Sequence, residues 1–456
     1  MQLDALPRHR PPTARPTPRP DPDRPASLTE CRQLGHAAIR LLNDHLPLPR
    51  PDLALYSSEA CLAVPLLSDL LRTSPEQAAR HAHLVRQLLP RPGASTRLPS
   101  ADTALRALHQ LPADQLADQL QALLTTQISL AIRQGAIPSD QPLILAADCH
   151  EIPTYHKKRP ATVRHPRTSE ALPLAVSTKP DAGTNLAFRF LTFHTTRGIP
   201  LTVLVEPVFP LDPLTRGLLE GLDTAEHRLG RPVDLFLHDA AAYGSETFAA
   251  LQRRMTPFIV RAPQNARIAR ELRQHQGLRA FVLADFPVRL RTDRVDDERV
   301  AVTLIAVSRE LLEGRGVDLS HTERRIRWFT YATNLHPRHG ESETDFALRI
   351  ALLYAERWDV ETSYRQIEEF RGFTHALHYD LRLLQFDLAV ILANLWALLR
   401  HRSRAVWTEG EVALFLVFGI LFLDVLGQRG VVRQEVEIPS GPIHPSVPLR
   451  RRHQKS

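Results

Sequence analysis

Two aspartates each terminate a short apolar run that is typical of a buried strand. Asp148 follows the run 142–147, and Asp239 follows the run 233–238. The carboxyl ends of strands in an open α/β sheet meet at one edge, where ligands usually bind. Both acids are therefore candidate site residues, although an aspartate after a strand is also a common turn initiator or helix cap.

A third candidate lies in a long helical stretch predicted from about Glu343 to Phe370. Helical spacing places Tyr354, Arg357 and Glu361 on one face, with Arg365 one turn further on. This stripe combines an aromatic ring, a cation and a carboxylate. An ordinary amphipathic helix with a Glu361–Arg365 pair would show the same pattern.

Three carboxylates from distant segments, Asp148, Asp239 and Glu361, suit two Mg²⁺ or Mn²⁺ ions. Hard cations prefer oxygen ligands, and paired ions about 3.5–4 Å apart can activate a nucleophile and stabilise the leaving oxygen at a phosphodiester. The chain has 57 Lys and Arg against 50 Asp and Glu, a formal charge of +7. That excess is compatible with a nucleic-acid partner, which it would hold against an acidic site.

Basic and imidazole side chains follow the first acid. Lys157 and Lys158 are candidate phosphate contacts, with a solvated loop as the alternative. Asp148, His150 and His156 would form a mixed zinc site, since imidazole and carboxylate both bind zinc. The chain has 21 histidines, however, so chance clustering is expected.

The elements that must position these residues indicate an α/β protein with additional helices. Residues 27–137 are predicted to be all-helical, and strands alternate with helices over 138–279, which favours a sheet covered on both faces. A β-rich stretch at 280–338 precedes further helices at 339–401. One more helix is predicted within 402–438.

The ends of the chain and its composition exclude several classes of protein. Residues 1–26 predict a disordered Pro/Arg-rich arm, and residues 439–456 predict a flexible basic tail. Three cysteines without a C-x-x-C pair favour a cytoplasmic protein. The most apolar run, 412–423, is too short to cross a bilayer, and the chain has no P-loop. We therefore expect neither a membrane partner nor a nucleotide cofactor.

From about residue 142 to 401 the chain resembles the DDE transposases of bacterial and archaeal insertion sequences, which have a ribonuclease H-like catalytic core. The resemblance is carried by Asp148-Cys-His-Glu-Ile-Pro-Thr-Tyr155, by Asp239 with Tyr243 after it, and by the Y-x2-R-x3-E spacing at Tyr354, Arg357 and Glu361. It implies that Asp148, Asp239 and Glu361 are catalytic and bind the two metal ions. It also implies that Tyr354 and Arg357 contact transposon-end DNA.

The same resemblance implies an architecture and an activity. The core at 138–279 would be interrupted by the insertion at 280–338 and completed by the glutamate-bearing helices at 339–401. Apart from the resemblance, the helical unit at 27–137 is a candidate DNA-end-binding domain, with helices that only pack together as the alternative. The activity would be metal-dependent cleavage at the terminal inverted repeats and strand transfer into target DNA, cut and paste. A homodimer on double-stranded DNA, associated with a prokaryotic nucleoid, would carry it out.

Two departures from the family pattern keep other functions open. Glu368 stands where the signature has a lysine, with Arg365 as a compensating cation, and Ala240-Ala241-Ala242 follow Asp239 where the family commonly has Arg-Gly-Phe. A non-catalytic or domesticated DNA-binding derivative of a transposase is therefore an alternative. A metal-dependent nuclease unrelated to transposition is another.

Overall fold

A computed structural model of the chain describes residues 44–46, 48, 56, 58–70, 73–80 and 99–403, apart from short internal gaps. The gaps fall at 109, 112, 156–161, 165–170, 174, 182–183, 210–212, 290–298, 318–322 and 373–378. Predictions for residues 1–26, for 404–456 and for Lys157, Lys158 and His156 lie outside the described residues.

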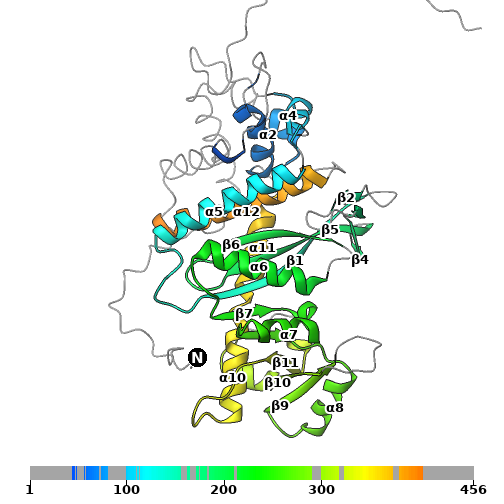
Figure 1. The fold of residues 1–456 in the computed structure, drawn as a ribbon, viewed down its shortest axis with the longest axis vertical. Coiled ribbons are helices and arrows are strands. Elements are labelled where there is room, and N and C mark those ends of the chain that lie inside the picture. Colours follow the sequence, from blue (N-terminus) through cyan, green and yellow to red (C-terminus); the bar gives the residue numbers. More distant parts are fainter. Residues whose placement is uncertain are drawn as a thin grey trace, which may run out of the picture.

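One mixed sheet runs through the centre of the molecule (Figure 1). Along its main path the strands are β4 (Val176–Asp181), β5 (Thr184–Thr195), β1 (Ile144–Pro153), β7 (Leu235–His238), β8 (Phe258–Arg261), β11 (Trp328–Thr333), β10 (Arg299–Ser308) and β9 (Ala280–Arg289). A further strand, β6 (Thr202–Val208), also pairs with β5. The pairs β1–β7 and β7–β8 are parallel, and the other pairs in this sheet are antiparallel.

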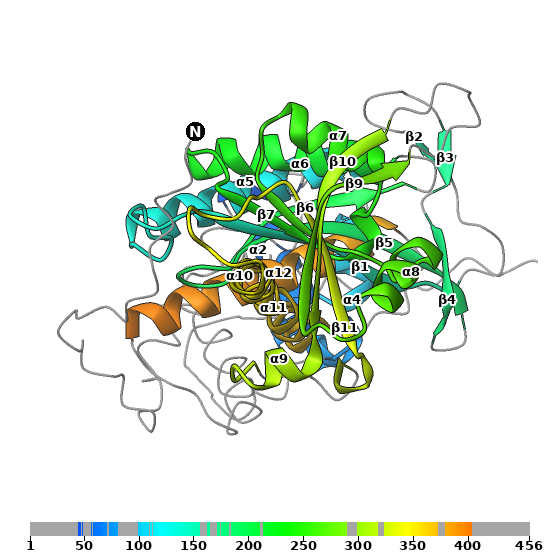
Figure 2. The same ribbon diagram turned by 90° about the horizontal axis from the view of Figure 1, so that it is seen from below.

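Apolar residues on both faces of the parallel strands explain why this part of the sheet is covered on both sides. Ile144 and Ala146 of β1 belong to one buried cluster, whereas Leu145 and Ala147 belong to another. Helices cover both faces, as Figure 2 shows: α6 (Leu214–Leu229) and α7 (Ser245–Arg253) lie on one side, and α10 (Glu343–Ala355) and α11 (Trp358–Phe370) lie on the other. The predicted α/β architecture is confirmed at this level.

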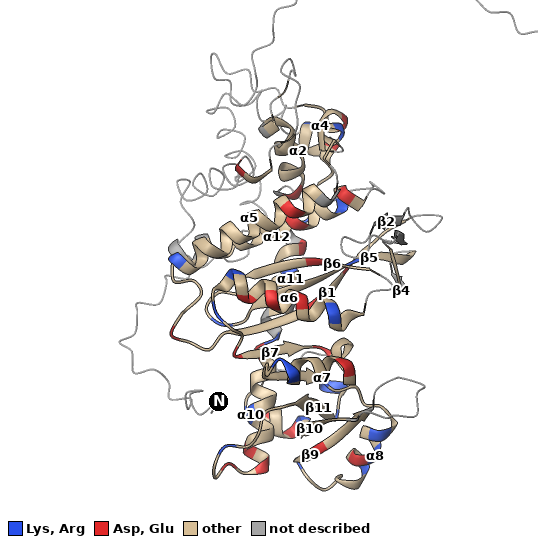
Figure 3. Cartoon of the chain, in the orientation of Figure 1, with Lys and Arg blue, Asp and Glu red and all other residues tan. Residues whose placement is uncertain are grey.

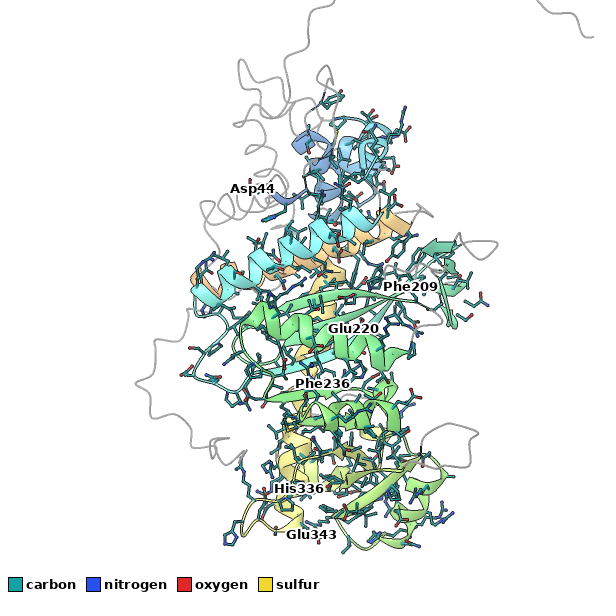
Figure 4. All side chains as sticks on the ribbon, viewed as in Figure 1. Asp44, Phe209, Glu220, Phe236, His336 and Glu343 are labelled. Carbon is teal, nitrogen blue, oxygen red and sulfur yellow. The ribbon has the colours of Figure 1, made fainter. Side chains whose placement is uncertain are left out.

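Aromatic side chains fill the centre of the first of these layers. Phe236 of β7, labelled in Figure 4, is fully buried and packs against Phe193 of β5. Phe248 of α7 stacks on Phe258 of β8, with ring centroids 5.2 Å apart. Burial of large rings contributes about 1.5–3 kcal/mol each, so this layer fixes the strands that carry the two aspartates.

The β-rich stretch predicted at 280–338 forms strands β9, β10 and β11. These strands extend the central sheet beyond β8 instead of forming a separate layer. Helix α8 (Ala266–Gln274) packs on the face of the sheet that α6 and α7 cover, and its Ile268 and Leu272 are buried there. A separate two-stranded ribbon consists of β2 (Thr162–Arg164) and β3 (Ala171–Pro173).

The helical stretch predicted from Glu343 to Phe370 consists of two helices, α10 and α11. At Glu356 and Arg357 the dihedral angles stay helical, but each N–H donates to a carbonyl three residues back, as in a 3-10 turn. Such a turn advances about 120° per residue, so it rotates α11 relative to α10. Tyr354 thus lies on α10, residue 361 lies on α11, and Arg357 lies at the boundary between the two helices.

Helices at the other end of the sheet form a third buried layer. They are α2 (Ser58–Leu70), α4 (Ala101–Leu108), α5 (Ala113–Arg133) and α12 (Tyr379–Ser403), which share one apolar cluster with Phe188 and Phe190 of β5. By length and composition α12 alone among the described helices could cross a membrane, but 94% of its apolar window, Tyr379–Leu398, is buried inside the protein. Its apolar character is explained by packing in the core.

Asp387 of α12 is a buried acid whose two carboxylate oxygens have no hydrogen-bond partner among the described residues. Burial raises its pKa well above 3.8, and the nearby charge of Arg228 only partly opposes this shift. The folded state therefore keeps a proton that the unfolded state releases once the pH exceeds about 4.

Because of that proton, wild-type stability should fall as the pH rises above 4, and Asp387→Asn should remove the fall. We expect the variant to equal the wild type near pH 4 and to be increasingly more stable towards pH 8. Urea unfolding at several pH values measures the difference. A constant difference across this range would contradict the prediction, and Asp380→Asn, at the start of the same helix, is the control.

Candidate functional site

The register of the parallel strands brings the two predicted aspartates together. Ala147 of β1 pairs with His238 of β7, and paired strands lie about 4.8 Å apart, so the next residues along, Asp148 in β1 and Asp239 just after β7, are neighbours. Each acid lies two residues beyond a side chain buried on the α10–α11 face, Ala146 and Leu237 respectively. Both carboxylates are thus directed towards that face.

Asp148 does not terminate its strand, contrary to the prediction. The antiparallel pairing with β5 continues past it to Pro153, and Asp148 itself pairs with Thr192. The pairing with β7 does end just before it, because β7 stops at His238. Asp148 is therefore paired with β5 on one side, whereas on its other side the neighbouring strand β7 has already ended.

Asp239 begins a short turn that orders the residues after it. Its Oδ1 accepts a hydrogen bond from the backbone N–H of Ala241, 2.9 Å away, and caps the 3-10 turn Ala240–Ala242. The Nδ1 of His238 lies 2.8 Å from the same oxygen. Burial raises the pKa of Asp239, but the hydrogen bonds from His238 and Ala241 outweigh it, and the net shift is downward.

Asp148 is shifted in the opposite direction. Burial and the negative charge of Asp239 raise its pKa, more than Arg357 lowers it. Two neighbouring carboxylates repel each other when both are ionised. The pair is thus an electrostatically unfavourable arrangement of two acids, which a cation between them would relieve.

Arg357 supplies a positive charge to this pair from the break between α10 and α11. Its Nη1 lies 3.2 Å from Oδ2 of Asp148, and its charge also acts on Asp239. The guanidinium lies 5.5 Å from the ring centroid of Tyr354. Tyr354 is itself buried and packs on Tyr331, so in this structure it contacts Arg357 from inside the core.

The next turns of α11 contact β1 along its length. The hydroxyl of Tyr364 donates to the backbone carbonyl of Asp148 at 3.0 Å, and it also bonds to Thr192. Further along, Glu368 accepts a hydrogen bond from Nε2 of His150, 2.8 Å away, and pairs with Arg371. Glu368 therefore connects α11 to β1, the strand that carries Asp148.

Residue 361 lies on α11 between two residues that both contact Asp148. Arg357 is four positions before it and Tyr364 is three positions after it, which is one helical stripe. The side chain of Glu361 lies outside the described set, and Arg365 is exposed on the same helix. Among the described residues no three His, Cys, Asp or Glu side chains gather closely enough to hold a metal ion.

The alternative zinc site has no support from the position of His150. Its imidazole stacks between Tyr364 and Phe386, with centroid distances of 4.9 and 5.1 Å, and its Nε2 is used by Glu368. His156, the third proposed ligand, lies outside the described residues. His150 thus has a structural role between β1, α11 and α12.

Arg261 is a candidate site residue that sequence reasoning missed. It pairs with Tyr331 on β11, and His238 pairs with Val260, so Asp148, Asp239 and Arg261 form one row across three strands. Its guanidinium lies 4.8 Å from the ring centroid of Phe329. Its place at the end of β8, parallel to the strand of Asp239, was the signal that could have found it.

Charges elsewhere on the described surface are mixed. Figure 3 shows Lys and Arg interspersed with Asp and Glu over both ends of the molecule. Over the described part of the chain no single sign of charge dominates, and the cations next to the two aspartates are Arg357 and Arg261.

Tyr364→Phe should weaken the contact between α11 and β1 without creating a cavity in the core. Loss of a buried hydroxyl that bonds to Asp148 and Thr192 is expected to cost about 1–2 kcal/mol of unfolding free energy. Urea unfolding measures the change. Tyr243→Phe is the control, because the Tyr243 ring packs edge-on against Phe248 away from α11, and an equal loss in both variants would contradict the assignment.

Comparisons with known proteins found a likeness in structure. No protein-family model matches the chain, and no curated protein matches it. Among solved structures it is similar to a cryo-EM structure of a piggyBac transposase synaptic complex with hairpin DNA, with a TM-score of 0.48 and 10% sequence identity. The match covers 91% of this chain and 80% of that one.

Proposed function

We propose that this chain is a DDE-type DNA transposase that cleaves the ends of a mobile element and joins them to target DNA. The observation that carries the proposal is the register that places Asp148 beside Asp239, on the face where Arg357 and Tyr364 of the late helices contact Asp148. Perturbed carboxylates next to fixed cations are typical of functional sites.

The proposal includes a ribonuclease H-like core built from β6, β5, β1, β7 and β8 and completed by α10 and α11. Antiparallel strands on one side of β1 and parallel strands on the other support it, because both acids then lie at one sheet edge. In this view the strands β9–β11 are an insertion at 280–338, and residues 27–137 bind the DNA ends.

Asp148, Asp239 and Glu361 are proposed to hold two Mg²⁺ or Mn²⁺ ions. The donor set fits hard cations, which prefer carboxylate oxygens. The raised pKa of Asp148 beside Asp239 also fits, since positive charge there would favour both ionised carboxylates. When bound, the ions would supply an activated water or 3′-hydroxyl and stabilise the leaving oxygen.

The remaining residues are proposed to bind and orient DNA. Arg357 and Arg261 flank the carboxylates and would hold a phosphate beside them, with Tyr354 fixing Arg357 from the core. Arg365, Lys157 and Lys158 would contact the backbone further out. The partner is double-stranded DNA bound by a homodimer, in a prokaryotic cytoplasm at the nucleoid.

The test uses the full chain and duplexes carrying the sequences that flank its coding region. We expect Mg²⁺-dependent nicking at the element ends and strand joining, and no reaction with EDTA. Cleavage without end specificity or joining would instead indicate a metal-dependent nuclease. End binding without cleavage would indicate the non-catalytic derivative, which the Ala240–Ala242 and Glu368 departures keep as the second candidate.

A further inference from the structure

His238 is a fully buried histidine whose polar contacts in the described structure are made by one ring nitrogen. Its Nδ1 lies 2.8 Å from Oδ1 of Asp239 and 3.3 Å from the backbone carbonyl of the same residue. Its Nε2 is buried and has no hydrogen-bond partner among the described residues. The His238 ring also lies beside the ring of Phe236, two residues earlier on β7, with centroids 6.0 Å apart.

This environment fixes the tautomer. Both groups that face Nδ1, an ionised carboxylate and a carbonyl, only accept hydrogen bonds, so Nδ1 must carry the proton. Nδ1–H of His238 is therefore the donor to Asp239.

The consequence for Asp239 is that one carboxylate oxygen is saturated and the other is not. Oδ1 accepts from both His238 and the N–H of Ala241, whereas Oδ2 receives no hydrogen bond from the described residues. Two donors at one oxygen restrict rotation of the carboxylate about its Cβ–Cγ bond. Partners of this kind orient metal-ligating carboxylates and strengthen metal binding.

We propose that His238 is a positioning residue, which holds the Asp239 carboxylate through Nδ1–H so that Oδ2 is presented to a divalent cation. The proposal rests on the proposed function, because it takes Asp239 as a metal ligand. His238 lies one position before Asp239, and the spacing of the carboxylates in the sequence gives no reason to select it.

The shapes of Asn and Gln allow a direct test. The side-chain amide nitrogen of Asn reaches the position of Nδ1, whereas that of Gln reaches the position of Nε2. Titration of the full chain with Mn²⁺, followed by the loss of the free Mn²⁺ electron paramagnetic resonance signal, measures affinity without catalysis. We expect His238→Asn to keep wild-type affinity within about threefold, and His238→Gln and His238→Ala to weaken it by about 10–100-fold.

Three comparisons make the outcome decisive. The ring of His275, the residue just after α8, stacks on Phe281, and His275→Ala should leave Mn²⁺ affinity unchanged. Equal Mn²⁺ binding by wild type and Asp239→Asn would overturn the proposed function. Loss of binding in Asp239→Asn with equal affinities in the Asn and Gln variants of His238 would overturn the positioning role alone. Circular dichroism identifies any variant that does not fold, and the Asn–Gln pair then decides.

Discussion

Asp239→Asn is expected to reduce Mg²⁺-dependent cleavage of element-end DNA by about 10³-fold, with duplex binding nearly unchanged. An amide keeps the shape of the carboxylate and accepts the Ala241 hydrogen bond, but it removes the negative charge that a divalent cation requires. Loss of about 4 kcal/mol of transition-state stabilisation corresponds to this factor. Asp148→Asn should act in the same way, because its carboxylate lies beside that of Asp239.

Gel-based cleavage assays and gel shifts on the same duplex separate the two effects. Glu151→Gln is the matched control, since Glu151 lies on β1 as well but pairs with Arg189 away from the carboxylate pair. It should cleave at close to the wild-type rate. Cleavage that survives in either Asp148→Asn or Asp239→Asn would remove that residue from the site.

Gly198→Ala is expected to lower the unfolding free energy by about 3 kcal/mol. Gly198 has φ +80, and an added Cβ would lie 2.5 Å from the carbonyl oxygen of Ala136 and 2.6 Å from Cδ of Pro138. The left-handed conformation costs about 1–2 kcal/mol for an L-residue, and crowding against a fixed backbone adds about 1–3 kcal/mol. This turn between β5 and β6 packs on the segment that leads into β1, so its displacement would disturb the strand of Asp148.

Gly230→Ala separates the two contributions. Gly230 also has positive φ, +67, but nothing lies within 4 Å of an added Cβ. Its substitution should cost only the conformational part, about 1–2 kcal/mol. Urea unfolding curves of both variants give the difference, and equal losses would show that the contact with Ala136 contributes nothing.

Much of the local architecture follows from the sequence. The apolar runs before Asp148 and Asp239 form β1 and β7, because continuous Val, Leu and Ile segments become buried strands between helical layers. The stretch predicted as β-rich at 280–338 contains β9, β10 and β11. Such features are set by neighbours in the chain, which is why patterns reveal them.

Helix termination and strand length proved harder to predict. The apolar pattern of 343–370 has no proline or glycine, so nothing in it marks the 3-10 turn at Glu356 and Arg357. The extension of β1 past Asp148 depends on β5, a partner that comes later in the chain. Neither outcome has a local signal, because each depends on packing against distant elements.

The sequence by itself determined the apolar runs that enter β1 and β7 and the helical character of the late segment, since those depend on local propensity and spacing. The tertiary structure decided the row of Asp148, Asp239 and Arg261, the contact of Arg357 with Asp148, and the pairing of Glu368 with His150. It also placed His238 against the second acid in a buried position. The physical reason is that register and close contact between segments far apart in the chain arise only when the sheet and its covering helices pack together.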